Sequence, residues 1–499
     1  MTRKVARKSL SKSKSGATAA ARAGLADPVV APGSPAKFRA RVRMYRHGLG
    51  DCFLLTFPRK KQPPFQMLID CGVLVSDSAA MTRMVEHIRD TVRNGDSASK
   101  ARLDVVVATH EHKDHLSGFN QARKVFSNDF DFGAVWLGWT ENLTQPEVKK
   151  IKEAKRKAIA SLRNALAAPV TAAAGDALDG VAALLGFSED EDDTGSGRIA
   201  EALDYLKLRG NDVGKLEFRE PGEGPIELDG VDGVRVYVLG PPQDPILLKG
   251  SEVTEKMKRE GVVYHLTRTG DAGLDALSAA LSATPGASME RSHPFSAEHR
   301  IARTSPYLAG IQQFVASTYD DPQQAWRRID HEWLSAFRQL ALDLDNDTNN
   351  TSLVLAFEFA QTGEVLLFVG DAQVGNWQSW ATLEFKVPDR EKPMPAHDLL
   401  RRTAFYKVGH HCSHNATLRT GGLELMTRND LVAFIPLDKA TAKKQGKNGW
   451  DMPAGPLYTA LQEKAGKRVV ISDVLEKLSP EAEKAGVIAT GTYVDYFLK

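Results

Sequence analysis

The fold of this chain can be predicted from one stretch, Thr109-His110-Glu111-His112-Lys113-Asp114-His115. It brings three histidines and an aspartate together within six residues, directly after the apolar run Leu103-Asp104-Val105-Val106-Val107-Ala108. That run is typical of a buried β-strand, so the polar residues begin where the strand ends. Imidazole and carboxylate groups together form the ligand set of Zn²⁺, Mn²⁺ or Fe. The pattern predicts a metal site, and the alternative is a polar loop with a few surface histidines.

The spacing inside this stretch predicts two metal ions rather than one. His110 and His112 are two residues apart, so at the extended end of a strand both side chains project to the same side. Asp114 and His115 follow after a turn and can face a second point nearby. The four side chains can therefore be divided between two neighbouring cations.

Two later strands also end in residues that can bind metals. Val365–Val369 runs into Gly370-Asp371, and a carboxylate after a glycine can approach two cations closely and bridge them. Phe405–Val408 runs into Gly409-His410-His411-Cys412-Ser413-His414, which has three histidines within five residues. An ordinary turn aspartate is the alternative for Asp371. The repeated order of buried strand and ligand-type residues favours a metal site.

Residues beside these motifs are candidates for orienting the ligands. Asp51 and Asp70 lie at the ends of a turn and a strand, and each can accept a hydrogen bond from a metal-binding imidazole or simply cap a turn. The three cysteines, Cys52, Cys71 and Cys412, all lie in these loops. A thiolate ligand is one interpretation, and a small buried thiol that packs the floor of the site is the other.

The composition is that of an ordinary globular protein and limits the classes of function. With 499 residues the chain is too long for one compact core, so we expect two or three structural units. The net charge of +2 excludes a globally basic surface, so nucleic-acid binding would require a local patch. No apolar run approaches the roughly 18 residues of a membrane span, and no secretory signal is recognisable. Three cysteines favour a reducing compartment, so we expect a cytoplasmic protein without membrane association.

Residues 1–36 differ from the rest of the chain. They contain seven basic residues and one acid, Asp27, and they lack apolar periodicity. Such a composition predicts a disordered basic tail. The tail is either a passive solubilising arm or an arm that binds nucleic acid or a partner.

The remaining sequence predicts an α/β (α+β) chain built from two groups of strands. Alternating or continuously apolar runs predict strands before residue 120 and after residue 345, with helical spacing between and beside them. The predicted strands are 40–45, 52–57, 67–72 and 103–108 in the first region, and 352–359, 365–369, 405–408, 431–435 and 468–471 in the second. Two groups of strands with helices outside favour a sandwich of two sheets covered by helices.

Residues 121–344 are interpreted as a large, mainly helical insertion. One or more sandwich strands are expected inside it, near 135–139 and 234–239. A basic amphipathic helix is predicted over 146–168, with its lysines clustered between 149 and 157. The acidic run at 188–193 is more typical of a solvated loop than of a metal site.

The motifs in this order resemble those of the metallo-β-lactamase superfamily. His110-Glu111-His112-Lys113-Asp114-His115 is similar to its HxHxDH signature, and the other segments resemble one branch, the ComEC/Rec2-like metallohydrolases. Those segments are Gly50-Asp51-Cys52-Phe53-Leu54, Ile69-Asp70-Cys71-Gly72, Asn349-Asn350-Thr351-Ser352, Gly370-Asp371 and Lys407-Val408-Gly409-His410-His411-Cys412-Ser413. The resemblance covers about residues 40–120, 230–245 and 345–480. It implies a four-layer αββα metallo-β-lactamase sandwich formed by residues 37–120 and 345–499.

The resemblance also implies a dinuclear centre of two divalent metal ions, zinc or manganese. His110, His112 and Asp371 would hold the first metal. The second would be held by Asp114, His115, Asp371 and one histidine of the 410–414 cluster.

The spacing does not decide among the three histidines of that cluster. We assign His410 to the metal and give His411 and His414 catalytic roles, in protonating the leaving group or binding a phosphate oxygen. Asp114 either binds the metal only or also orients the attacking water as a general base.

Three departures from the family pattern bear on this assignment. Cys412 stands where the branch usually carries glycine, and Met452 stands where many relatives carry a late histidine. Methionine is a poor ligand for hard or borderline cations, so one metal is expected to be held less firmly. The isolated middle histidine of the superfamily has no counterpart. The histidines of the insertion are more typical of surface or packing positions: His265, His293, His299 and His331.

These observations predict a metal-dependent hydrolase, with a phosphodiester in nucleic acid or a nucleotide as the favoured substrate. The basic tail and the lysine cluster at 149–157 agree with a phosphate-bearing substrate. One alternative is a partner-binding component of a multiprotein system, docked through the insertion, with a regulatory or vestigial metal site. Another is a hydrolase of small esters or lactones, because fold alone does not fix the reaction.

Overall fold

The computed structural model describes residues 31–35, 37–75, 77–95, 99–167, 186, 199–248, 306–319, 321, 323, 341–388, 390–445, 449–473 and 478–499. Most of the predicted tail, the acidic run at 188–193 and the four insertion histidines lie outside these residues.

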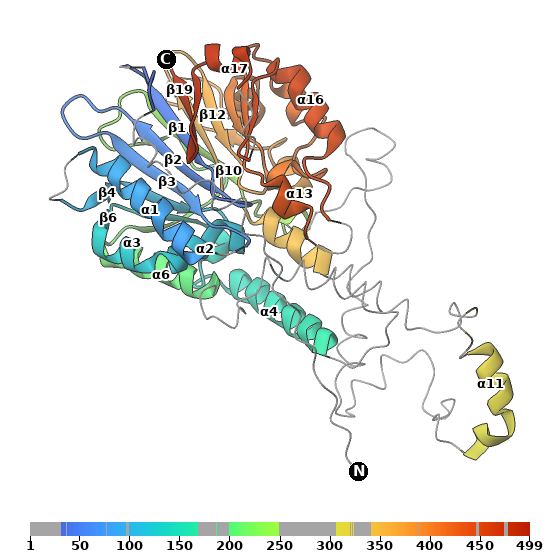
Figure 1. Ribbon diagram of the computed structural model, residues 1–499. Coiled ribbons are helices and arrows are strands. Elements are labelled where there is room, and N and C mark those ends of the chain that lie inside the picture. The colour runs from blue at the N-terminus through green and yellow to red at the C-terminus, as the bar shows by residue number, and fades with distance from the viewer. Residues whose placement is uncertain are drawn as a thin grey trace.

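Two large mixed sheets dominate the part of the chain that the structure describes (Figure 1). The eight-stranded sheet has the order β18 (Val487–Ala489), β19 (Tyr493–Leu498), β1 (Ala40–Tyr45), β2 (Cys52–Phe57), β3 (Phe65–Cys71), β5 (Val105–Ala108), β7 (Val135–Gly138) and β8 (Leu216–Arg219). The seven-stranded sheet has the order β17 (Val469–Ile471), β16 (Val432–Ile435), β15 (Thr403–Lys407), β12 (Val365–Phe368), β11 (Val354–Phe359), β10 (Val234–Gly240) and β9 (Ile226–Glu227).

The two sheets pack face to face through a shared apolar core. Alternate residues of each strand enter this core, as the period of two of a β-strand requires. The rings of Phe53 and Phe368 lie 5.7 Å apart across the interface, and those of Phe57 and Phe357 lie 5.8 Å apart. Burial of these large rings is the main attraction between the sheets.

Helices cover the outer face of each sheet (Figure 1). The eight-stranded sheet packs against α1 (Ser78–Arg93), α2 (Lys113–Gln121), α3 (Arg123–Asp129) and α6 (Ile199–Asp212). The seven-stranded sheet packs against α13 (Val374–Ser379), α14 (Ala396–Arg401) and α16 (Gly455–Ala465). The layers therefore run helix, sheet, sheet, helix, and the prediction of a mixed α/β chain with more than one sheet is confirmed.

The span 121–344 contributes strands to both sheets, because β7, β8, β9 and β10 all belong to it. The sequence pattern did not predict β8 and β9, which are too short to be distinguished by their alternation. The basic helix is α4 (Pro146–Ala167). The remaining elements are β4 (Ala101–Leu103), β6 (Phe130–Phe132), η2 (Trp139–Glu141), α7 (Pro245–Leu248), η5 (Pro306–Ile311), α11 (Gln312–Thr318), a helical segment over 341–350, β13 (Glu384–Phe385), β14 (Met394–Pro395), η7 (His410–Cys412), η8 (Leu423–Leu425), α15 (Lys439–Ala442) and α17 (Pro480–Lys484). Among the described helices, none combines the length and apolar character needed to cross a membrane.

The carboxyl ends of strands from both sheets meet at one edge of the sandwich. β3 and β5 are parallel neighbours in one sheet, and β12 and β15 are parallel neighbours in the other. The backbone N–H of Leu353, just before β11, donates to the carbonyl of Thr109, just after β5, over 2.9 Å. This contact joins the histidine-rich loop after β5 to the segment Asn349-Asn350-Thr351-Ser352 that leads into β11 of the other sheet.

Candidate metal centre

The histidine-rich loop follows β5 and leads directly into α2, whose N-cap is His112. His110, His112, Asp114 and His115 are all buried, with at most 3% of each residue exposed. Gly72 at the end of β3 permits this arrangement, because a Cβ atom there would lie 2.4 Å from backbone atoms of Asp114 and His115. The loop therefore turns its ligand-type side chains into the protein and not toward solvent.

Asp371 lies at the centre of the cluster, after β12 and Gly370. Its Oδ1 accepts hydrogen bonds from the backbone N–H of His410 over 2.8 Å and from Lys407 Nζ over 3.1 Å. Its Oδ2 lies 3.1 Å from Nε2 of His115. One oxygen is thus anchored by the protein, and the other faces the histidines.

Two groups of buried donors share Asp371. His110, His115 and Asp371 form one group, in which all ligand atoms lie within 4.8 Å of one another. Asp114, Asp371 and His411 form another group with the same spacing. A carboxylate common to two such groups is the arrangement expected of a ligand that bridges two cations.

His411 belongs to a group of donors that could hold a metal, whereas His410, to which the sequence analysis assigned the metal, belongs to none among the described residues. His411 Nε2 lies 2.8 Å from Asp114 Oδ2, while its Nδ1–H donates to the carbonyl of Pro436 over 2.6 Å. That hydrogen bond to a carbonyl fixes the tautomer and leaves Nε2 as the ligand atom.

His410 contacts other polar side chains. Its Nδ1 lies 2.8 Å from Ser413 Oγ and 3.2 Å from Gln373 Nε2, and its Nε2 lies 3.5 Å from Asn349 Nδ2. The left-handed backbone over 410–412 turns these adjacent histidines in different directions, which spacing alone could not reveal. His414 is only partly buried, and among the described residues it belongs to none of the groups that could hold a metal.

Asp70 holds His115 in place from the side away from Asp371. Its Oδ2 lies 2.7 Å from Nδ1 of His115 and accepts a hydrogen bond from Thr109 Oγ1 over 2.7 Å. Asp51 instead forms a short ion pair with Lys407. Of the two predicted orienting carboxylates, Asp70 therefore makes the closer contact with the imidazole, while Asp51 Oδ2 lies 3.9 Å from Nδ1 of His115 and pairs with Lys407. Asp51, Asp70 and His115 form a third group of donors close enough to hold an ion.

Asp345 is a buried carboxylate in the helical segment 341–350 and belongs to none of the motifs recognised in the sequence. Its Oδ1 lies 3.7 Å from Nε2 of His112, and its Oδ2 accepts a hydrogen bond from Asn349 Nδ2 over 3.2 Å. The signal that could have revealed it is its position one helical turn before the Asn349-Asn350 motif.

The charges in this cluster suit a bound cation. Five aspartates are buried there, with 5% or less of each exposed: Asp51, Asp70, Asp114, Asp345 and Asp371. Lys407 pairs with Asp51 and Asp371. Within the described part of the chain, Asp114 Oδ1 and Asp345 Oδ1 have no hydrogen-bond partner. A buried carboxylate must be paired, bind a metal or take up a proton, and burial beside Asp114 and Asp371 raises the pKa of Asp345 well above its ordinary value. A divalent cation would supply the missing positive charge, so this donor set fits one.

The pKa values of the cluster reflect the same burial and the same close approach of charged groups. Burial alone would raise the pKa of Asp371, but the charges of His115 and Lys407 bring it well below its ordinary value. Burial lowers the pKa of His115, yet the carboxylates of Asp371 and Asp114 raise it well above its ordinary value. Burial raises the pKa of Asp51 to about 6 in spite of Lys407. The cluster without a cation therefore retains a proton on His115 at neutral pH.

Neither the cysteines nor Met452 takes part in the ligand groups. Cys52, Cys71 and Cys412 are fully buried in apolar clusters, and burial raises the pKa of the Cys412 thiol to about 12. Met452 packs against the apolar core beneath the seven-stranded sheet. The cysteines thus fit the interpretation of buried thiols that pack the site.

The basic helix α4 lies against the histidine-rich loop. Lys152 and Lys155 donate to the carboxylate of Glu111 over 2.8 and 3.0 Å, and Lys152 also donates to Glu141 over 2.5 Å. Beyond these contacts α4 runs outward from the layered body (Figure 1). The helix that carries the predicted lysine cluster is therefore anchored beside the metal ligands.

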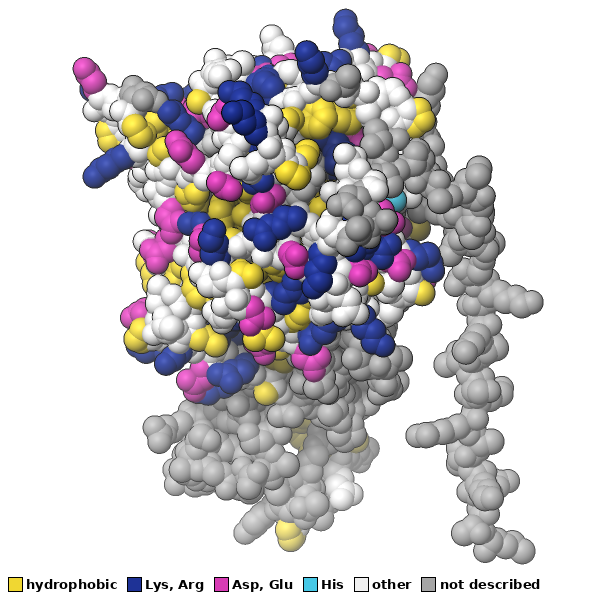
Figure 2. All heavy atoms as spheres, turned by 90° about the vertical axis from the view of Figure 1, so that its left-hand side faces the viewer, with side chains coloured by type: hydrophobic (Ala, Val, Ile, Leu, Met, Phe, Trp, Pro, Cys, Tyr) yellow, Lys and Arg dark blue, Asp and Glu magenta, His cyan; other side chains and the backbone are white. Residues whose placement is uncertain are grey.

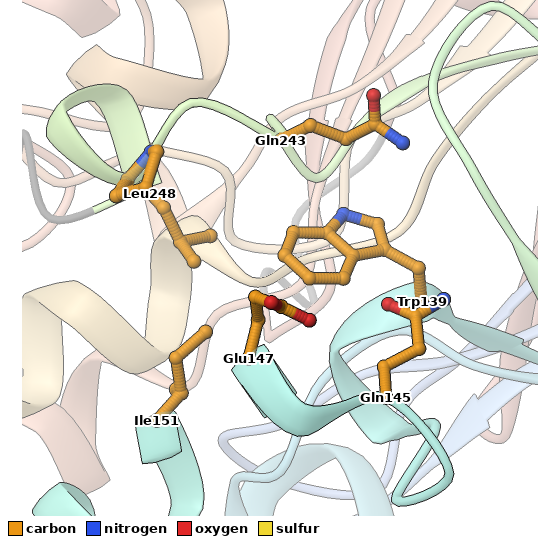
Figure 3. Close-up of a pocket in the computed structure, with 7 residues that line it drawn as sticks. Trp139, Gln145, Glu147, Ile151, Gln243 and Leu248 are labelled. Carbon is orange, nitrogen blue, oxygen red and sulfur yellow. The ribbon is translucent and has the colours of Figure 1, made fainter. Parts of the chain in front are cut away.

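A small cavity lies at the start of the same helix (Figure 3). Its volume is about 220 Å³, and its lining residues are Trp139, Gln145, Glu147, Ile151, Gln243, Pro245 and Leu248. Ile151 and Leu248 face the indole of Trp139 across the opening (Figure 3). The cavity is thus mainly apolar. Residues of α4 form part of its wall, and the same helix contacts the histidine-rich loop through Lys152 and Lys155.

No protein-family model matches the chain, and no curated protein matches it. The class of site therefore rests on geometry alone: a buried cluster of histidines and aspartates at one edge of a two-sheet sandwich, able to hold metal ions.

Proposed function

We propose that the chain is a metal-dependent hydrolase of the metallo-β-lactamase fold, similar to the ComEC/Rec2-like branch, that cleaves phosphodiester bonds in nucleic acid or nucleotides. The observation that carries the proposal is the position of Asp371, which is common to two groups of buried donors. The layering of helices on two facing sheets, with the cluster at the carboxyl ends of strands, supports the fold assignment.

The proposed ligand set uses buried side chains from both sheets. As the resemblance implies, His110, His112 and Asp371 would hold one divalent cation, and Asp114, His115, His411 and Asp371 would hold the other. His110, His115 and Asp371 lie close enough together to share an ion, and His112 joins them through the 3.0 Å contact between its Nδ1 and Nε2 of His110. Two such cations, zinc or manganese, supply Lewis acidity toward a phosphoryl oxygen and toward the attacking water.

Other groups of the protein orient the proposed ligands and determine which of them carry a proton. Asp70 and the carbonyl of Pro436 fix the rings of His115 and His411 through their Nδ1 atoms. Asp114 directs its Oδ2 toward His411, which leaves Oδ1 able to accept a hydrogen bond from the attacking water. The pKa of Asp114 lies below its ordinary value, because His115 and His411 outweigh the effect of burial. Asp114 is therefore ionised and suited to act as the general base.

Positive charge beside the cluster supports a phosphate-bearing substrate. Lys149, Lys150 and Arg156 are exposed on α4, whose Lys152 and Lys155 contact the histidine-rich loop. The face drawn in Figure 2 carries lysines and arginines interspersed with acids, and no extended field of one sign. Glu147 and Glu153 are also exposed on α4, and Glu153 pairs with Lys157, so the basic residues of α4 exceed its acids and give it a local positive charge of the kind that phosphate contacts require.

The second candidate is a hydrolase of small esters or lactones. The apolar cavity between Trp139, Ile151 and Leu248 favours this second candidate, because the acyl chain of an ester or lactone could pack against these side chains (Figure 3). The three free and buried cysteines support a cytoplasmic location for either activity.

One screen separates the two candidates. The metal-loaded protein is incubated with single- and double-stranded DNA, RNA, a cyclic nucleotide and a lactone, with His112→Ala as the control. Hydrolysis of a phosphodiester that is lost in His112→Ala would support the proposal. Hydrolysis of the lactone alone would replace it by the second candidate.

A further inference from the structure

The histidines of the cluster share one pattern of contacts. His115 directs Nδ1 to Asp70 and Nε2 to Asp371, and His411 directs Nδ1 to Pro436 and Nε2 to Asp114. In each ring, Nδ1 contacts an oxygen atom at the edge of the cluster, and Nε2 faces a carboxylate at its centre.

His110 follows the same pattern from the neighbouring loop position. Its Nδ1 lies 3.1 Å from Thr109 Oγ1, and its Nε2 lies 3.0 Å from Nδ1 of His112. Two ligand atoms on one cation lie about 3–3.5 Å apart when each bond is near 2.1 Å. A cation held by both histidines would therefore use Nδ1 of His112, which leaves Nε2 of His112 on the side of Asp345.

Asp345 lies beside Nε2 of His112. Asp345 Oδ1 is 3.7 Å from His112 Nε2 and has no hydrogen-bond partner in the described residues. Asn349 holds the other oxygen of Asp345 from the same helical segment. The carboxylate is buried beside other carboxylates, a position that costs stability unless it serves a partner.

We propose that Asp345 is a positioning residue for the first cation: it accepts the Nε2–H of His112 and so presents Nδ1 of His112 as the ligand atom. This inference rests on the proposed function, because it assumes that His110 and His112 hold a cation. Asp345 would thereby fix the orientation of the His112 ring. Carboxylates in this role raise metal affinity 10–100-fold in other proteins.

The inference predicts a specific loss of affinity. Asp345→Ala should weaken binding of one of two cations roughly 10–100-fold in a titration with Mn²⁺ or Zn²⁺ followed by calorimetry. Asp345→Asn, whose amide oxygen can still accept the Nε2–H, should restore part of the affinity. Asp343→Ala is the matched control, since it removes a half-buried aspartate from the same segment, about 200° away around the helix.

Two further measurements separate positioning from a structural role and from direct ligation. Removal of Asp345 should leave the metal-free protein at least as resistant to thermal unfolding in EDTA, whereas a purely structural residue would lower that resistance. With Co²⁺ at saturation, the absorption spectrum of Asp345→Ala should match that of the wild type. A changed spectrum would make Asp345 a ligand and would overturn the positioning role.

The outcomes also distinguish this inference from the proposed function. A wild-type protein that binds two cations, with equal affinity in Asp345→Ala, overturns the inference and leaves the proposed function intact. A wild-type protein that binds no divalent cation overturns both.

Discussion

His411 Nε2 lies 2.8 Å from Asp114 Oδ2, although the two residues are 297 positions apart in the chain. The contact brings the loop after β15, in one sheet, to the first turn of α2, beside the other sheet. It exists because the carboxyl ends of the two sets of parallel strands meet at one edge of the sandwich. The candidate site is therefore a property of the packed sheets, and neither sheet contains it alone.

The first prediction concerns the two adjacent histidines. His411→Ala should weaken one of two bound cations by more than the roughly 10–100-fold that loss of an orienting partner costs, because it removes an inward nitrogen. His410→Ala is the matched control and should retain both cations, since its ring contacts Ser413 and Gln373. Equilibrium dialysis with elemental analysis measures both variants. Loss of a cation in His410→Ala with retention in His411→Ala would reverse the ligand assignment.

A second prediction concerns protons. Burial lowers the pKa of His115, but Asp371 and Asp114 raise it above the ordinary value, so the metal-free ring carries a proton at neutral pH. A cation must displace that proton, and cation affinity should therefore decrease as the pH falls. Calorimetric titrations in two buffers with different enthalpies of ionisation should show net proton release on binding at pH 7. Equal heats in both buffers would contradict this.

A third prediction concerns the basic helix. Lys149→Glu combined with Lys150→Glu should weaken binding of single-stranded DNA measured in EDTA, where no cleavage occurs. If each lysine contacts one phosphate, the slope of log K against log salt concentration should become less steep by about 1.4, because each contact with a single strand contributes about 0.7.

The matched control for the helix is Lys60→Glu combined with Lys61→Glu. These adjacent exposed lysines lie in the turn between β2 and β3, at the end of the sheet away from Asp51 and Asp70. This variant makes the same change in charge and should retain the affinity. Equal losses in both variants would indicate a general effect of charge and would argue against α4 as the binding surface.

A fourth prediction separates the scaffold from the site. Arg43 on β1 and Asp495 on β19 form a fully buried bidentate ion pair, with both hydrogen bonds at 2.7 Å. Asp495→Ala would leave the guanidinium buried without this partner, so unfolding free energy should fall by about 3–5 kcal/mol. Chemical denaturation measures the loss. Cation affinity of the folded variant should stay unchanged, and a matching loss of affinity would mean that the pair supports the site directly.

Much of the layout could be predicted from the sequence because it depends on local patterns. Apolar runs with period two predict strands, and polar residues directly after them lie at strand ends. For this reason His110, Asp114, His115 and Asp371 lie close together, with His112 beside His110. That they bind metal stays a prediction.

What could not be predicted depends on backbone turns and on packing between distant segments. The choice between His410 and His411 depends on left-handed backbone over 410–412, which the residue types do not specify. Asp345 belongs to no motif and reaches His112 only because the segment 341–350 packs beside the cluster. The expected weakness of one metal followed from Met452 and from the unmatched middle histidine. The contact with Asp345 bears only on the metal that His112 would hold.

The most direct measurement is the number of divalent cations bound per chain in the wild type and in Asp371→Ala, determined by elemental analysis after equilibration with Mn²⁺ or Zn²⁺. Asp371 is common to both donor groups, so we predict two cations in the wild type and weakened binding of both in the variant. A well-folded wild type without bound cations, or an Asp371→Ala variant that still binds two with unchanged affinity, would contradict a dinuclear site centred on Asp371.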